Sequence, residues 1–299
     1  MIKALIATLM ALIGYTVTAQ GFQGQATYES KTTVDMDGWG GKDMTPDMKA
    51  MIKKRMKSML EKTYILDFTQ STSMYKEDVQ LAAGGGGGFS FSMNGNSKMY
   101  KDVRSGNYVD QREMFGKTFK IEDDLPALDW KLTQESRKIG NYTAYKATAM
   151  KPVAKTDWMN ARRKRRADRK KEEEGEVAEA ETQDKENEEE ESDNPMDNFE
   201  IPEEIEVVAW YTPEIPVNQG PAEYWGLPGL ILEVSAGRTT LLCSKIVMNP
   251  EERAPIEAPR KGEKVTQEEY DEKIQKMMTE MQERGGWGGG RRGRGGRRG

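Results

Sequence analysis

The segment from Glu206 to Val247 constrains the fold most, because it is the densest apolar stretch after the N-terminus and turn residues interrupt it. Val207–Tyr211 is β-branched and aromatic, which predicts a strand. Leu230–Val234 is nearly all apolar, which predicts a second strand buried on both faces. Thr239–Val247 predicts its partner, after a turn at Gly237.

Prolines and glycines shape the connection between the first two of these strands. Pro213, Pro216 and the pair Gly220-Pro221 exclude regular strand pairing and predict an ordered loop. Pro228 and Gly229 occupy the central positions of a predicted type II turn, in which Gly229 takes a positive φ. By the two-residue period, Leu230 and Leu232 are expected on one face and Ile231 on the other.

One hexapeptide in this segment resembles the signature of the GLPGLI family of secreted bacterial proteins. It consists of Gly226, Leu227, Pro228, Gly229, Leu230 and Ile231. Supporting similarities are Ala209–Thr212, Ile215-Pro216, Gly220-Pro221 and Leu232–Val234, and further upstream Trp130–Leu132, Ile139–Tyr142 and Lys146-Ala147. Members of that family often carry a cysteine where this chain has Ala144, so a thiol role there is absent. The resemblance covers roughly residues 25–250 and implies an exported, mostly β protein without implying an activity.

Two residue counts restrict the chemistry. The 299 residues include no histidine, which removes the usual general base, the usual triad partner and the commonest zinc ligand. Cys243 is the single cysteine, so no intramolecular disulfide can form. We interpret its thiol as a small apolar side chain on a strand; intermolecular pairing and metal ligation are the alternatives.

The N-terminus reads as an export signal. Lys3 precedes about twelve apolar residues, and Val17 and Ala19 are small residues at −3 and −1 of a cleavage site. We expect residues 1–19 to be a signal peptide, and the mature protein to be periplasmic or secreted. No cysteine follows the site, and the apolar stretch is too short to span a membrane, so no transmembrane or lipid anchor is expected.

Regularly spaced short strands predict one discontinuous β-rich domain over residues 20–159 and 199–250. Its expected strands, besides those above, are 25–30, 63–68, 73–75, 98–102, 107–111 and 118–121, with a hairpin of 130–133 and 142–150.

Two amphipathic helices are also expected. The first covers about 46–61, capped by Thr45, with Met48, Met51, Ile52, Met56, Met59 and Leu60 in one stripe. The second covers 266–284, after a proline-containing linker at 251–265. Thr266 and Glu269 fit a capping box there, and its stripe consists of Tyr270, Ile274, Met277, Met278 and Met281.

Two segments are too polar to form a core. Residues 160–198 pass from a basic to an acidic block, and we predict a disordered insertion looped out between two strands. Binding of calcium or a cationic partner is the alternative for this block. Residues 285–299 form an Arg/Gly-rich tail that is also expected to be disordered.

The methionines and the tail are candidate binding features. The nineteen methionines suit a packed core at helical spacing, with a groove for apolar ligands or a Cu(I) site as alternatives. The tail arginines resemble segments that follow phosphate backbones; they are Arg291, Arg292, Arg294, Arg297 and Arg298. In an exported protein we expect them to meet envelope polyanions. Self-association with the acidic insertion and nucleic acid are the alternatives, and the exported location argues against nucleic acid.

Candidate catalytic carboxylates are present but form no recognisable pair. Those in the β region near turns are Asp67, Asp102, Glu214, Glu223 and Glu233. A hydrolase with two carboxylates is therefore an alternative function. Glu223 and Trp225, just before the signature turn, are the residues that we expect at a rim or ligand site.

Together these features predict an α+β protein, predominantly antiparallel β, with a curved sheet or half-barrel and one or two amphipathic helices. Such a sheet resembles half-barrel envelope carriers of acyl chains or lipoproteins. The expected function is non-enzymatic, without a cofactor: an exported envelope protein that binds an apolar or polyanionic partner, such as a lipid, a glycolipid or an outer-membrane protein. A Met-rich copper protein and a carboxylate hydrolase are the alternatives.

Overall fold

The computed structural model describes residues 22–33, 60–78, 95–153, 162–163, 199–200 and 202–283, together with residues 45, 47, 48, 50 and 51. The predicted signal peptide, most of the helix predicted at 46–61, most of the insertion and the tail lie outside these residues. Within them, no helix has the length and apolarity needed to cross a membrane.

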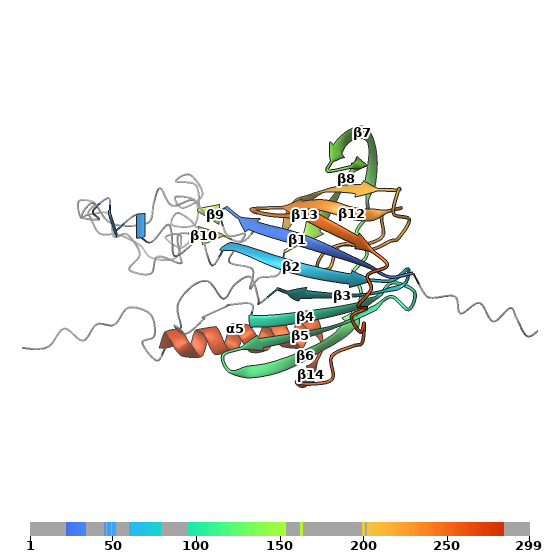
Figure 1. Cartoon of the computed structure of the whole chain (residues 1–299). Coiled ribbons are helices and arrows are strands. Elements are labelled where there is room, and N and C mark those ends of the chain that lie inside the picture. Colours follow the sequence, from blue (N-terminus) through green and yellow to red (C-terminus); the bar gives the residue numbers. More distant parts are fainter. Residues whose placement is uncertain are drawn as a thin grey trace, which may run out of the picture.

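A single open sheet of twelve strands dominates the structure (Figure 1). Its strands are β1 (Gly24–Thr32), β2 (Glu61–Phe68), β3 (Thr72–Glu77), β4 (Gly95–Asp102), β5 (Asn107–Met114), β6 (Lys117–Asp124), β7 (Lys131–Ile139), β8 (Tyr142–Pro152), β11 (Glu204–Thr212), β12 (Leu230–Ala236), β13 (Thr239–Met248) and β14 (Glu263–Val265). The predicted predominantly antiparallel sheet is confirmed, because only β14 pairs with its neighbour, β6, in parallel.

The first strand of the chain, β1, and one of the last, β13, lie side by side near the centre of the sheet. The strand order is β14-β6-β5-β4-β3-β2-β1-β13-β12-β11-β8-β7. The strands β1 to β6 form one meander, and β7, β8 and β11 to β13 form the other half. The region between residues 153 and 202 leaves from the end of β8 and returns to β11, which pairs directly with β8.

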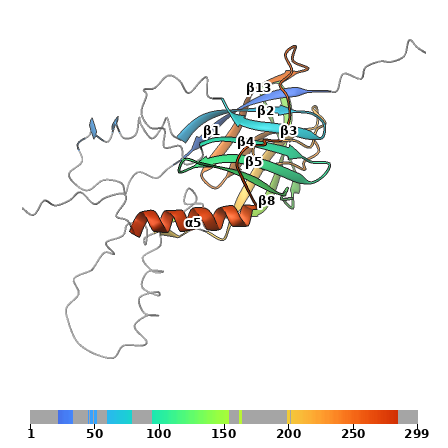
Figure 2. The ribbon, with the colours of Figure 1, turned by 90° about the horizontal axis from the view of Figure 1, so that it is seen from below.

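The sheet curves around one of its faces, which we call the covered face. Side chains from β4 and β8, which are separated by six strands in the sheet order, both contact the loop between β11 and β12 there. The helix α5 (Gln267–Glu283) lies along the same face, where Tyr270 packs edge-on against Phe119 at 5.4 Å between ring centroids (Figure 2). The opposite, convex side of strands β14 to β13 is called the open face below.

The N-terminus of α5 forms the predicted capping box. The backbone N–H of Glu269 donates to Thr266 Oγ1 at 3.2 Å, and the backbone N–H of Thr266 donates to Glu269 Oε2 at 3.0 Å. The inner side of the helix buries Tyr270 and Ile274. The segment predicted as a linker at 251–265 differs from the expectation at its end, since β14 forms there and extends the sheet.

The core consists of two groups of buried side chains, and the partly buried Ala222 packs against both. Leu230 and Leu232 belong to the larger group, with Tyr28, Phe68 and others, whereas Ile231 belongs to the smaller one around Val207 and Ala209. The three leucine and isoleucine side chains are at most 1% exposed, so the predicted strand buried on both faces is confirmed. A register shift between Trp210 and Tyr211 adds one residue to β12 at this point.

The signature turn differs in detail from the expected type II turn. Gly229 has the predicted positive φ, at 156°, but a type II turn has about 80° at that position. Its N–H donates to the carbonyl of Leu227 at 2.8 Å, while the N–H of Leu230 donates to Ile215 instead. A Cβ on Gly229 would lie 2.1 Å from the carbonyl oxygen of Thr212, so close backbone approach requires glycine here.

Two further predictions fall partly on described residues. In the predicted insertion, Arg162–Arg163 form the short strand β9, which pairs with β10 (Phe199–Glu200). In the helix predicted at 46–61, residues 47, 48, 50, 51 and 60 are helical, and the backbone N–H of Met48 donates to Thr45 Oγ1 at 3.3 Å, as expected for the cap. Met48 and Met51 are 49% and 68% exposed, so these two side chains do not pack on the sheet as expected.

Candidate functional site

The loop of residues 213–229 fills part of the covered face. Ile215, Val217, Gln219 and Leu227 are at most 3% exposed. The backbone N–H of Ile231 donates to the carbonyl of Gln219 at 3.0 Å, which fixes the loop beside the start of β12. The loop is ordered, as predicted from its prolines and glycines. This order favours a structural role for the signature residues.

Lys101 reaches this loop from the opposite half of the sheet. Its side chain is fully buried, and Nζ donates to the carbonyl oxygens of Gly220 at 2.6 Å and Tyr224 at 3.2 Å. Burial lowers the pKa of Lys101 to about 7, and the charge of Glu223 opposes that shift in part. The low pKa follows from the cost of desolvating an ammonium group.

Glu223 forms an ion pair with Lys151 at the end of β8. The two side chains are 29% and 28% exposed, so the pair lies at the rim of the covered face. Burial alone would raise the pKa of Glu223, but the charge and hydrogen bond of Lys151, with a smaller effect of Arg112, lower it to about 2. Glu223 and Trp225 were expected at a rim or ligand site. Glu223 is partly exposed, and its role in binding a ligand stays a prediction.

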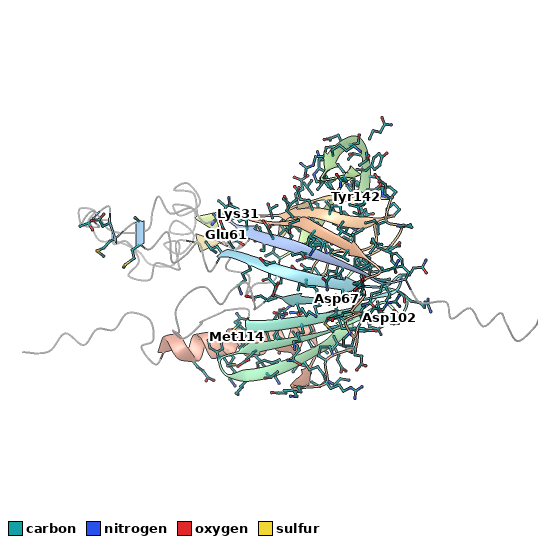
Figure 3. The ribbon with its side chains drawn as sticks, in the orientation of Figure 1. Lys31, Glu61, Asp67, Asp102, Met114 and Tyr142 are labelled. Atoms are coloured by element: carbon teal, nitrogen blue, oxygen red, sulfur yellow. The ribbon has the colours of Figure 1, made fainter. Side chains whose placement is uncertain are left out.

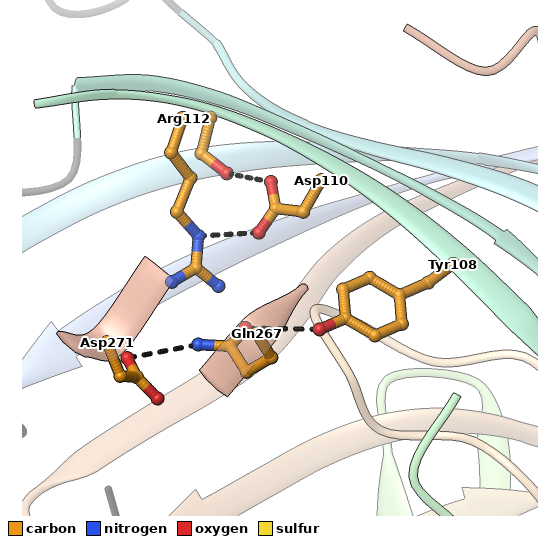
Figure 4. A network of polar contacts seen from close by, with 6 residues as sticks. Tyr108, Asp110, Arg112, Gln267 and Asp271 are labelled. Carbon is orange, nitrogen blue, oxygen red and sulfur yellow. Dashed lines mark hydrogen bonds and ion pairs between the residues drawn. The ribbon is translucent and has the colours of Figure 1, made fainter. Parts of the chain in front are cut away.

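A polar network joins β5 to α5 (Figure 4). Arg112 Nε donates to Asp110 Oδ2 at 2.6 Å, and the guanidinium lies 5.4 Å from the ring centre of Tyr270. Tyr108 donates its hydroxyl hydrogen to Gln267 Oε1 at 3.1 Å. Burial lowers the pKa of Arg112, but the adjacent Asp110 carboxylate outweighs this effect and raises it. These contacts attach the helix to the sheet.

The five candidate carboxylates are dispersed, and each bonds to a different partner. Asp67 pairs with Lys76 at 3.0 Å, Asp102 accepts from the backbone N–H of Arg104, Glu214 accepts from the backbone N–H of Thr143, Glu223 pairs with Lys151 and Glu233 pairs with Arg137. In Figure 3, Asp67 and Asp102 lie at one end of the strands, opposite Lys31 and Glu61. None of these contacts joins two of the five carboxylates to each other.

The described part of the chain also offers little for a metal. It contains no group of three or more histidine, cysteine or acidic side chains arranged to hold an ion. Met74, Met99 and Met114 are buried with the core, as expected for methionine that fills space. Cys243 is half-buried and free, and burial raises the pKa of its thiol to about 12, so it is not a reactive thiolate.

A row of lysines crosses the open face, and sequence reasoning missed it. Directly paired residues on eight adjacent strands form the row, in the order Lys264, Lys120, Gln111, Lys98, Lys76, Ile65, Thr27 and Lys245. Paired residues in a sheet point to the same face, so the five ammonium groups share one side. With strands about 4.8 Å apart, the row extends over roughly 34 Å. We call these eight residues the lysine row.

Not all of these charges are neutralised within the protein. Lys76 pairs with Asp67, and Lys120 and Lys264 share Glu122. Lys98 and Lys245 are exposed and take part in none of the ion pairs of the described residues. The row thus keeps an excess of positive charge. The tail arginines lie outside the described residues.

Comparisons with known proteins give a family match without a function. The model of a family described as a protein of unknown function (Porph_ging) matches residues 130–233, from the start of β7 into β12. The match includes both segments that resemble the GLPGLI family. Membership of that family stays a prediction. No curated protein matches the sequence.

Among solved structures, the chain is similar to two structures of PNGF-II, in space groups C2 and P21. The identities are 12% and 11%, with TM-scores of 0.44 and 0.45. Each match covers 85% of this chain and 33% of the other, so this chain spans about a third of the PNGF-II chain.

Proposed function

We propose that the protein is a non-enzymatic, exported envelope protein that binds a polyanionic partner through the open face of its sheet. The lysine row carries this proposal. Lys98 lies directly opposite Lys76, and like charges in that arrangement are destabilising. Asp67 offsets the charge of Lys76, but Lys98 and Lys245 have no carboxylate partner among the described residues. An anionic partner that lies against the row would neutralise these two lysines.

The covered face favours binding over catalysis. Its ionic side chains bond to one another or to backbone carbonyls, which occupies them in structural contacts. The same face argues against an apolar guest, because the 213–229 loop and α5 already pack on it. Of the two partner classes expected from the sequence, the polyanion is therefore the better supported.

Export is part of the proposal and rests on residues 1–19. A lipid, a glycolipid or another anionic envelope component is the partner class that such a location offers. The arginines of the tail would add a second set of cations. N-terminal sequencing of the exported form checks this part, and recovery of Met1 would remove it.

The binding proposal is tested with dextran sulfate as a generic polyanion. The K98Q/K245Q/K264Q variant removes three exposed charges of the lysine row and leaves the buried Asp67–Lys76 pair intact. The control variant K31Q/K131Q/K261Q removes three exposed lysines elsewhere. Affinity should fall steeply with salt in the wild type and in the control. The dependence on salt should be weaker in the row variant, because fewer counterions are displaced.

Deletion of residues 285–299 distinguishes binding by the tail from binding by the sheet in the same assay. If binding disappears with the tail and is unchanged in the row variant, the open face is not the binding surface. Equal affinity of the row variant and its control would contradict the proposal.

A further inference from the structure

We infer that the partner of the lysine row is a linear acidic polysaccharide that lies across the strands in single file. This inference rests on the proposed function and specifies its partner. It follows from the width of the row, from its direction relative to the curvature of the sheet, and from the side chains that it contains.

The row is one residue wide because carboxylates flank it on both sides. Glu122 lies two residues from Lys120 on one side, and the exposed Glu29 and Glu113 lie two residues from Thr27 and Gln111 on the other. Residues two apart in a strand share a face. A broad anionic surface would meet these carboxylates together with the lysines, whereas a single chain within the row meets the lysines alone.

The direction of the row favours a flexible chain over a flat surface as the binding partner. The row crosses the strands, and this is the direction in which the sheet curves around the 213–229 loop. A planar bilayer would touch only the crest of a convex row, and its ends, Lys264 and Lys245, would turn away. A flexible linear polymer can follow the curvature and contact all five lysines.

The chemistry of the row suits carboxylated or sulfated sugars. All five cations are lysines, point charges that pair with carboxylate, sulfate or phosphate alike, so selectivity for sugars has to come from the neutral side chains of the row. Thr27 and Gln111 lie between them and can bond to sugar hydroxyls. The row contains no aromatic side chain on which a nucleic-acid base could stack.

The test measures binding of full-length protein to polygalacturonate oligomers of increasing length by titration calorimetry. These oligomers are linear and carry one carboxylate on every sugar. Affinity should rise with oligomer length until the row is covered and then level off. The K98Q/K245Q/K264Q variant should bind about tenfold or more weakly than the K31Q/K131Q/K261Q control. The methyl-esterified oligomer, which keeps the sugars and loses the charge, should not bind.

Two further probes identify the alternatives. These are vesicles containing phosphatidylglycerol and single-stranded DNA, each measured with the same two variants. If the row variant loses binding to vesicles or DNA but wild type does not bind polygalacturonate, the inference is overturned while the proposed function stands. Equal binding of the charged and esterified oligomers also overturns it. If no probe distinguishes the row variant from its control, the inference and the proposed function both fall.

Discussion

Lys101 Nζ, on the fourth strand of the chain, donates a 2.6 Å hydrogen bond to the carbonyl oxygen of Gly220, 119 residues later. The bond links the two halves of the sheet through the interior, because Gly220 belongs to the loop between β11 and β12. A buried polar group costs stability unless it is bonded, so this contact depends on both partners. We expect the loop to lose its fixed position when Lys101 is replaced.

Lys101→Met tests this link and its dependence on pH. The pKa of Lys101 is about 7 in the folded protein and near 10.4 when unfolded, so the unfolded state binds more protons between these values. The unfavourable burial of charge is therefore present below pH 7 and is relieved as pH rises. At pH 9 the variant lacks the two hydrogen bonds to carbonyl oxygens, so Lys101→Met should lower the free energy of unfolding by roughly 1–3 kcal/mol. At pH 6 the loss should be smaller, because the wild type then also carries the cost of burying a charged lysine.

Denaturant unfolding at several pH values between 6 and 9 measures this difference. Lys98→Met, three residues earlier on the open face, is the matched control for loss of an exposed lysine. A destabilisation by Lys101→Met that is the same at pH 6 and pH 9 would contradict the lowered pKa.

Glu223→Gln probes the ion pair at the rim. The pKa of Glu223 is about 2 in the folded protein, below the unfolded value near 4.3, because Lys151 and Arg112 outweigh burial. Its stabilising contribution is thus complete above about pH 4.5 and is lost as pH falls toward 2. Glu223→Gln should cost roughly 1–2 kcal/mol at pH 7 and nearly nothing at pH 2.

Glu135→Gln is the comparison for this pair, since Glu135 also pairs with a lysine but is 60% exposed. It should change stability by less than about 0.5 kcal/mol at either pH. Thermal melts across the acid range provide the measurement, and parallel curves for wild type and Glu223→Gln would exclude the proposed contribution.

Local sequence patterns predicted the elements, while the functional surface needed the register of distant strands. The capping box at Thr266 and Glu269 and the alternation in β1 or β8 depend on neighbours a few residues apart, so the sequence contains them. The lysine row joins Lys264 to Lys98 and Lys76 through pairings between strands that are remote in the chain. Such pairings follow from the whole sheet, and no spacing in the sequence reveals them.

The contacts on the covered face could also be predicted only in part from the sequence. Lys101 follows the period of its strand, where Met99 also points inward, but a buried lysine contradicts the usual pattern of strand residues. Only the position of the 213–229 loop provides the carbonyls that make this burial tolerable. Glu223 could be singled out because it precedes the signature turn, although its partner Lys151 could not.

Gly229→Ala should be among the most damaging small substitutions in the chain. An added Cβ would lie 2.1 Å from the Thr212 carbonyl oxygen and 2.5 Å from its carbon, which forces the backbone apart. We expect a loss of at least about 3 kcal/mol. Gly226→Ala is the control: its φ is 91°, but its nearest neighbour, Trp130, is 3.8 Å away, so only about 1 kcal/mol of backbone strain should appear. Similar unfolding free energies for the two variants would contradict the steric argument.

Leu232→Ala tests whether the strand after the signature is core. Leu232 is 1% exposed and packs in the larger buried group, so truncation removes contacts and leaves a cavity that the curved sheet cannot close. The expected cost is roughly 2–5 kcal/mol. Leu242, on the neighbouring strand, is 39% exposed, and Leu242→Ala should cost less than about 1 kcal/mol. Chemical denaturation of both variants measures the difference. If Leu232→Ala were as mild as Leu242→Ala, β12 would not anchor the fold, and the signature would have to act as an exposed recognition surface.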